Sequence, residues 1–171
     1  EDPYLASEMV VPYIEGVQSN GVAACVKHYA LNNQEYDRHA VNVEVSDRAL
    51  YEIYLPAFKA AVQKGKAWSI MGAYNRYKNQ YCCHNQYLLN DILRKEWGFD
   101  GVIMSDWNTT VPEDGSIPWK CVTAGNDIIM PGNAADAENI RKAFEDGKLS
   151  EEVVRMCAGR ILNLIHTLTA E

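Results

Sequence analysis

The chain lacks any run of apolar residues that approaches the length of a membrane span, which needs about 18 consecutive apolar residues. It also lacks an excess of positive charge: its formal net charge is −7, so it offers no surface suited to phosphates. Five cysteines are present, but none has Cys-x-x-Cys spacing and two are adjacent. We therefore expect no membrane span, no nucleic-acid partner and no metal, and a neutral ligand suits the charge balance.

The sequence also lacks an initial methionine and an apolar leader segment. With no disulfide framework indicated, the cysteines are expected to be buried structural thiols, which favours a reducing compartment. A secreted protein whose signal has been removed is the alternative. The sequence therefore leaves the compartment open.

Short apolar runs alternate with segments of helical periodicity along all 171 residues. The predicted strands are 22–26, 68–73, 102–105 and 127–130, and the predicted helices are 3–20, 46–65, 88–97, 119–124, 137–147 and 150–168. Pro56 is expected to bend the second helix or to mark its start. Strands that alternate with helices form parallel βαβ units. We predict an α/β fold with about four parallel strands, roughly half of a (β/α)8 barrel, in one domain without internal boundary.

Reactive side chains fall at the carboxyl ends of three predicted strands: Lys27, His28, Met71, Tyr74, Asp106 and Trp107. Parallel strands bring these ends to one edge, where α/β enzymes hold their chemistry. Hydrogen-bonding groups beside aromatic faces suit a polyhydroxylated ligand. An ionised Asp106 near Lys27 is available as a nucleophile. From these residues alone, Asp106 is equally well interpreted as the cap of a following helix.

The motifs Lys27-His28-Tyr29 and Ser105-Asp106-Trp107 resemble those of glycoside hydrolase family 3. Similar stretches are 32–35, 47–56, 71–75, 93–101, 124–127 and 130–132, so the resemblance covers essentially the whole chain. It implies a TIM-type (β/α)8 barrel, of which residues 1–171 form the C-terminal half. It also implies a retaining, exo-acting β-glycosidase that needs neither a metal nor an organic cofactor. The resemblance favours catalysis over capping as the role of Asp106.

The resemblance assigns a role to each strand-end residue. Asp106 matches the nucleophile that forms a covalent glycosyl-enzyme, while Lys27 and His28 match a pair that binds sugar hydroxyls. The lining of the first subsite is matched by Met71, Tyr74 and Trp107. A tryptophan after the nucleophile resembles β-glucosidases, whereas members of the β-xylosidase type often carry cysteine there. The expected substrate is therefore a terminal β-D-glucosyl residue, with a β-xyloside as the alternative.

The same resemblance implies that parts of the active site lie elsewhere. Typical members carry the acid/base glutamate in a separate α/β-sandwich domain and further sugar-binding residues on earlier barrel strands. We therefore expect the missing strands and that domain as partners of this chain. Glu35 or Asp37 is the alternative acid, although a carboxylate on a surface loop is more often solvated. A β-N-acetylglucosaminidase is the other alternative within the family. Members that act on β-N-acetylglucosaminides use a loop histidine in a motif from which residues 29–31 depart, although His39 is nearby.

Two other interpretations belong to different classes of protein. Lys27, at the end of a strand in an α/β barrel, could form a Schiff base with a carbonyl substrate, as an aldolase lysine does. Alternatively, a chain without an acid/base would be a non-catalytic fragment or a carbohydrate-binding module.

Overall fold

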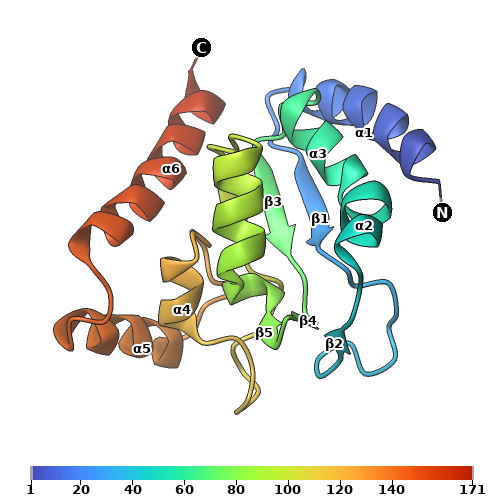
Figure 1. The fold of residues 1–171 in the computed structure, drawn as a ribbon. Helices are drawn as coiled ribbons and strands as arrows, with labels where there is room; N and C mark the ends of the chain where they lie inside the picture. The colour runs from blue at the N-terminus through green and yellow to red at the C-terminus, as the bar shows by residue number, and fades with distance from the viewer. Residues whose placement is uncertain (1, 171) are drawn as a thin grey trace.

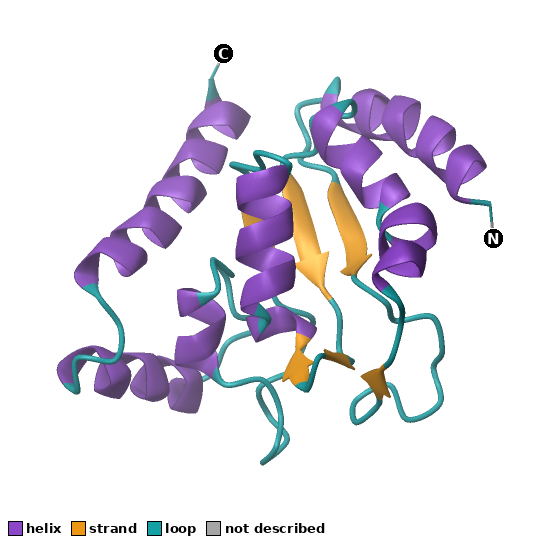
Figure 2. Ribbon diagram, in the orientation of Figure 1, coloured by secondary structure: helices purple, strands orange, loops and turns teal. Residues whose placement is uncertain are grey.

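The computed structural model describes residues 2–170. Its main sheet has three parallel strands in the order β1 (Cys25–Tyr29), β3 (Ser69–Gly72) and β6 (Val102–Met104), drawn in Figure 1. Ser69 pairs with Cys25 on one side and with Val102 on the other. Helical segments join successive strands, and Figure 2 shows the helix at Tyr87–Glu96, which lies between β3 and β6 in the sequence, in front of the sheet. Each new strand is added at the same edge, which is the order of a parallel barrel.

The first helix, α1 (Pro3–Gln18), begins where the sequence predicts. The Asp2 carboxylate accepts hydrogen bonds from the backbone N–H groups of Tyr4 and Leu5, and proline occupies the first helical position. The predicted helix 46–65 is divided into α2 (Asp47–Ala49), the π-helical η1 (Leu50–Tyr54) and α3 (Pro56–Gln63). Because Pro56 has no N–H to continue the preceding turns, a new helix begins there.

The later helices follow the predicted segments closely. They are the π-helical η3 (Tyr87–Glu96), α4 (Pro118–Thr123), α5 (Ala134–Glu145) and α6 (Glu151–Thr169). The short 3-10 helix η2 (Cys82–His84) was not predicted. A second small sheet was not predicted; it contains β2 (Asn42–Val43), β4 (Arg76–Tyr77) and β5 (Gln80–Tyr81). Strands of two residues are too short to show a periodic pattern, which is why the sequence did not reveal them.

The first main strand lies further along the chain than predicted. β1 begins at Cys25 instead of residue 22, so that Lys27 and His28 lie within the strand and not after it. The buried residues Tyr29 and Ala30 explain the difference, since they hold the chain in the core beyond the polar pair. The apolar run at 22–26 therefore marked the approach to the strand and only its first two residues.

The predicted fourth strand, 127–130, is reduced to a single parallel bridge between Met104 and Ile128. On either side of this bridge, side chains take the place of backbone groups as hydrogen-bond acceptors. The Ile103 N–H donates to the Asp127 carboxylate, and the Met130 N–H donates to the Ser105 hydroxyl. The segment therefore lies beside β6 in the predicted direction but lacks a regular ladder.

The core lies between the main sheet and the helices. Its buried members include Leu50, Ile70, Leu89, Trp97 and Ile103. The strand register places Cys25, Met71 and Met104 on the opposite face, where the Cys25 and Met104 sulfurs are 3.8 Å apart. That face is less covered, since Cys25 is exposed and both methionines are half-buried.

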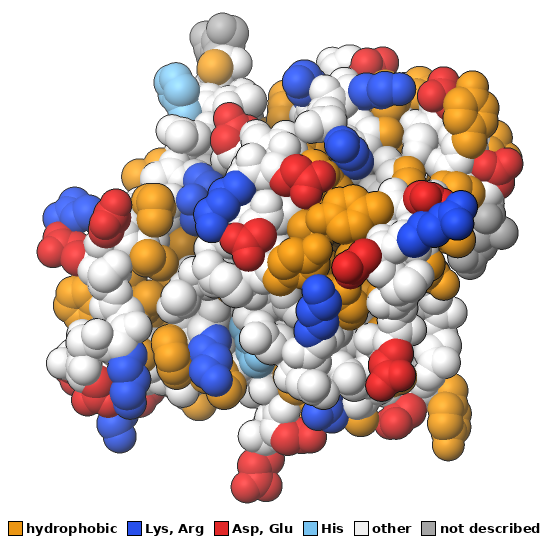
Figure 3. All heavy atoms as spheres, in the orientation of Figure 1, with side chains coloured by type: hydrophobic (Ala, Val, Ile, Leu, Met, Phe, Trp, Pro, Cys, Tyr) orange, Lys and Arg blue, Asp and Glu red, His pale blue; other side chains and the backbone are white. Residues whose placement is uncertain are grey.

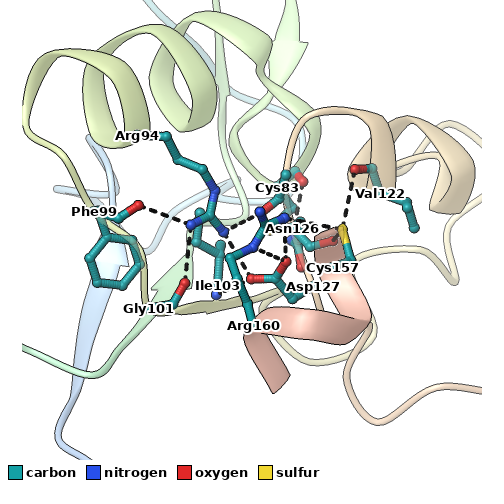
Figure 4. A network of polar contacts seen from close by, with 11 residues as sticks. Cys83, Arg94, Phe99, Gly101, Ile103, Val122, Asn126, Asp127, Cys157 and Arg160 are labelled. Atoms are coloured by element: carbon teal, nitrogen blue, oxygen red, sulfur yellow. Dashed lines mark hydrogen bonds and ion pairs between the residues drawn. The ribbon is translucent and has the colours of Figure 1, made fainter. Parts of the chain in front are cut away.

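A buried ion network joins α6 and η3 to the segment beside β6 (Figure 4). The Asp127 side chain has no exposed surface; its two oxygens lie 2.9 Å from Arg94 and 2.8 Å from Arg160. Arg94 also donates to the backbone carbonyls of Phe99 and Gly101, immediately before β6. These contacts secure the amino end of the strand that leads to Asp106.

On the surface, acidic and basic side chains are interspersed over the face drawn in Figure 3. None of the helices within residues 2–170 combines the length and the apolar character needed to cross a bilayer.

Candidate active site

The carboxyl ends of β1, β3 and β6 lie at the same end of the main sheet because the three strands are parallel. Figure 1 shows the arrowheads of β1 and β3 pointing toward the same group of loops. Asp106 follows the end of β6 by two residues, Tyr74 follows the end of β3 by two residues, and His28 lies near the end of β1. The topology therefore brings a carboxylate, a phenol and an imidazole to the carboxyl end of the sheet.

Asp106 is buried, with 5% of its surface exposed. Its Oδ1 accepts a hydrogen bond from the Trp107 N–H at 2.7 Å, and its Oδ2 lies 3.5 Å from Nε2 of His28. Within residues 2–170, Oδ2 has no hydrogen-bond partner. A buried carboxylate oxygen without a donor carries a desolvation cost of about 1–3 kcal/mol, which a hydroxyl group of a ligand would relieve.

His28 faces this carboxylate as a neutral imidazole at neutral pH. Burial lowers the pKa of His28 below its ordinary value of 6.5; the nearby Lys27 charge also lowers it, while Asp106 opposes the shift. Because burial has the largest effect, the pair is not a full ion pair at pH 7. A neutral imidazole donates at one nitrogen and accepts at the other, so it can bind a sugar hydroxyl beside Asp106.

Tyr74 is connected to the same site through the backbone of Trp107. The Tyr74 hydroxyl donates to the Trp107 carbonyl at 2.7 Å. Burial raises the pKa of Tyr74, and the Asp106 charge raises it further, so the phenol remains protonated near neutral pH. Its ring packs against His39, with the centroids 4.3 Å apart, and beneath the Arg38 guanidinium at 4.7 Å. The polar loop at 32–41 thus lies over Tyr74.

The other three predicted site residues have no side-chain contact with Asp106 among those found in the described residues. Lys27 is exposed and forms no ion pair with any carboxylate in the part of the chain that the structure describes. Met71 is half-buried and pairs with Met104 across β3 and β6. Trp107 is 51% exposed as a whole residue, while its backbone forms hydrogen bonds with both Asp106 and Tyr74. Lys27 and His28 also line a hollow of about 540 Å³.

Cys83 was not singled out from the sequence. It is completely buried, and its sulfur accepts a hydrogen bond from the Asp106 N–H at 3.4 Å. No motif marks this cysteine, because its position depends on the path of the chain after the β4–β5 hairpin. Over residues 2–170 there is no cluster of three or more histidine, cysteine or acidic residues arranged to hold a metal ion.

Parallel strands joined by helices, with a carboxylate, an imidazole and a phenol at their carboxyl ends, define this chain as part of a TIM-type α/β barrel with a strand-end site. Residues 1–164 match the family model described as the glycosyl hydrolase family 3 N terminal domain. The chain therefore belongs to glycosyl hydrolase family 3. This membership confirms the family and the fold class that the sequence predicted.

Relatives with established names cover nearly the whole chain. It is 51% identical to the beta-glucosidase BoGH3A of Bacteroides ovatus, over 96% of this chain and 23% of that protein. It is 41% identical to an exo-alpha-(1->6)-L-arabinopyranosidase of Bifidobacterium longum, over 99% and 22%. The structure of beta-glucosidase 3B from Thermotoga neapolitana in complex with glucose is similar, with a TM-score of 0.91 at 46% identity, over 98% and 24%. The chain thus spans about a quarter of the length of these proteins.

Proposed function

We propose that residues 1–171 form the C-terminal half of the catalytic barrel of a retaining, exo-acting β-glycosidase. In this proposal the enzyme removes terminal, non-reducing β-D-glucosyl residues and Asp106 is its nucleophile. The observation that carries the proposal is the environment of Asp106: a buried carboxylate at a strand end, with one oxygen lacking a hydrogen-bond donor among the described residues. The β-glucosidase names of several relatives support the reaction class.

The reaction would proceed in two displacements. An Asp106 oxygen forms a bond to the anomeric carbon while the bond from that carbon to the leaving oxygen breaks, and a second carboxylic acid gives its proton to the departing oxygen. Water then attacks the glycosyl-enzyme, loses a proton to the same second group and releases the sugar. The two carboxyl groups of a retaining enzyme are about 5–5.5 Å apart.

We place this second carboxyl group outside the chain, in an α/β-sandwich domain of the same enzyme. Glu35, the alternative on the polar loop, is exposed and forms an ion pair with Arg38. Asp37 is also exposed. The uncovered face of the sheet, with Cys25 and Lys27 exposed, suits the interior of a barrel, which further strands paired at the edge of the sheet would enclose.

The remaining site residues would bind the sugar. Lys27 and His28 are assigned to its hydroxyl groups, as a cation and a neutral imidazole both donate hydrogen bonds. Tyr74 is assigned to the first subsite through its position beside Asp106, and the exposed Trp107 indole is assigned to the apolar face of the ring. Met71 is assigned to the wall of the same subsite.

Covalent trapping tests the nucleophile. The complete enzyme is incubated with a 2-deoxy-2-fluoro-β-glucoside, digested and analysed by mass spectrometry, and we expect the fluoroglucosyl adduct on Asp106. Asp106→Ala should lose nearly all turnover, with azide restoring part of it as a small external nucleophile. The matched control is Asp100→Ala, an exposed aspartate before β6. An adduct elsewhere, or unchanged kcat in Asp106→Ala, would overturn the proposal.

Substrate preference needs a separate comparison. The nitrophenyl β-glucoside should have the highest kcat/KM in a panel with the β-xyloside, the β-N-acetylglucosaminide and the α-L-arabinopyranoside. The last is included because one 41% identical relative is named an arabinopyranosidase. Residues 1–171 alone should show negligible turnover, since they hold only one of the two carboxyl groups. Robust turnover by this segment would contradict the external acid/base, and borohydride trapping of a carbonyl substrate on Lys27 would favour the Schiff-base class.

A further inference from the structure

The thiol of Cys83 connects the chain segments that follow two strands of the main sheet. Its sulfur accepts the Asp106 N–H at 3.4 Å, and the thiol donates to the Ala73 carbonyl, also at 3.4 Å. Ala73 immediately precedes Tyr74. One buried side chain therefore contacts the backbone of the proposed nucleophile and the backbone adjacent to the phenol beside it.

The position of this thiol is closely constrained. A Cβ atom added at Gly72 would lie 2.6 Å from the Cys83 sulfur, so only glycine leaves room for it at the end of β3. Burial raises the pKa of Cys83 to about 12. The group is therefore a neutral thiol at physiological pH, able to donate to one backbone group and to accept from the other.

We propose that Cys83 is a positioning residue for Asp106. Its two contacts hold the backbone after β6 against the backbone after β3, which keeps the carboxylate and the Tyr74 phenol in one geometry. Cys83 is not a catalytic residue, because it is completely buried and contacts Asp106 only at the backbone N–H. This inference rests on the proposed function of Asp106.

Cys82 provides a natural comparison. It is also completely buried, and burial likewise raises its pKa to about 12. Its sulfur contacts the Ala30 carbonyl at 3.3 Å and the Asn75 side chain at 3.4 Å. The two adjacent cysteines thus have equal burial, yet only Cys83 contacts Asp106. A purely structural role predicts similar consequences for the loss of either thiol.

The test compares Cys83→Ala, Cys83→Ser and Cys82→Ala in the complete enzyme. The readouts are kcat and KM on nitrophenyl β-glucoside, the melting temperature, and the rate at which a 2-deoxy-2-fluoro-β-glucoside labels Asp106. A displacement of the nucleophile by a fraction of an ångström acts on the chemical step, so Cys83→Ala should lower kcat and the labelling rate by about tenfold, with KM within about twofold of wild type. Serine keeps both hydrogen-bonding functions and should recover activity to within about threefold of wild type.

Cys82→Ala should lower the melting temperature comparably but leave kcat within about twofold of wild type. Equal kcat losses in Cys82→Ala and Cys83→Ala, or a Cys83→Ser variant no better than Cys83→Ala, would overturn the proposal. If Cys83→Ala fails to fold, Cys83→Val is tested instead, because valine occupies the buried volume but forms no side-chain hydrogen bond. Activity of Cys83→Val equal to that of Cys83→Ser would then overturn the proposal. Absence of label on Asp106 in the wild-type enzyme would instead refute the proposed function.

Discussion

The substitution Asp127→Asn would remove a buried negative charge that two arginines share. The Asp127 side chain is fully buried between Arg94 of η3 and Arg160 of α6. Asparagine has nearly the same size, and its single carbonyl oxygen can still accept the Ile103 N–H that Asp127 binds at 2.8 Å. Asp127→Asn therefore isolates the effect of the charge from that of the packing.

The magnitude follows from the burial of the network. Loss of one partner of a buried ion pair costs about 3–5 kcal/mol, because the other charge stays desolvated. Arg94 keeps the carbonyls of Phe99, Gly101 and Gly125 as hydrogen-bond acceptors, so we expect a loss near the lower end, about 3 kcal/mol. A domain of 150–250 residues loses about 2–4 °C of melting temperature per kcal/mol, and larger domains lose less. Because this chain is only part of its barrel domain, the expected decrease is near the lower end, roughly 6 °C.

Thermal unfolding of the complete protein at pH 7, followed by fluorescence, provides the measurement. Asp91→Asn is the matched control: Asp91 pairs with Lys95 at 2.8 Å, but both side chains are exposed. Such a pair contributes less than about 1 kcal/mol, so the control should lose less than about 4 °C. Equal melting temperatures for the two variants would refute the reasoning that the buried network secures α6 and η3 beside β6.

Two further predictions concern residues around Cys83. The His84 Nδ1 accepts the Ile117 N–H at 3.0 Å, and burial, with a smaller effect of the Lys120 charge, lowers the pKa of His84 to about 4. The folded state favours the neutral form of His84, so its contribution to stability is full above about pH 6.5 and falls as the pH drops toward 4, by up to about 2 kcal/mol for this partly exposed group. His84→Asn should make the melting temperature depend less on pH over this range. An unchanged pH dependence would show that His84 is not the group responsible. Gly72→Ala should cost about 1–3 kcal/mol by overpacking against the Cys83 sulfur, and adding Cys83→Ala should recover part of the lost melting temperature, whereas strictly additive losses would exclude this clash.

Much of the secondary structure was predictable because its signals are local. The Asp2 and Ser150 caps mark the starts of α1 and α6, and apolar periodicity marks the helices between them. The exceptions depend on distant partners. β1 includes Lys27 and His28 because Tyr29 packs in the core, and the segment at 127–130 forms one bridge because side chains replace its backbone partners.

The candidate site divides in the same way. The strand-end pattern and the family motifs singled out Asp106 and His28, and the structure places them 3.5 Å apart. The contact of Arg38 and His39 with Tyr74 depends on how the polar loop folds back, which no periodic pattern encodes. The roles of Lys27, Met71 and Trp107 in sugar binding stay predictions.

The sequence by itself determined the alternation of strands and helices, the family, and the placement of a carboxylate at the end of β6, because hydrophobic periodicity, caps and motifs are properties of neighbouring residues. Only the tertiary structure decided which groups surround that carboxylate. Among the described residues, the neutral state of His28, the lack of a hydrogen-bond donor to Asp106 Oδ2 and the contact of the Cys83 thiol with the Asp106 N–H all arise from burial and from contacts between residues far apart in the chain. Desolvation acts on a group only when other segments exclude water from it, and that requires the folded chain.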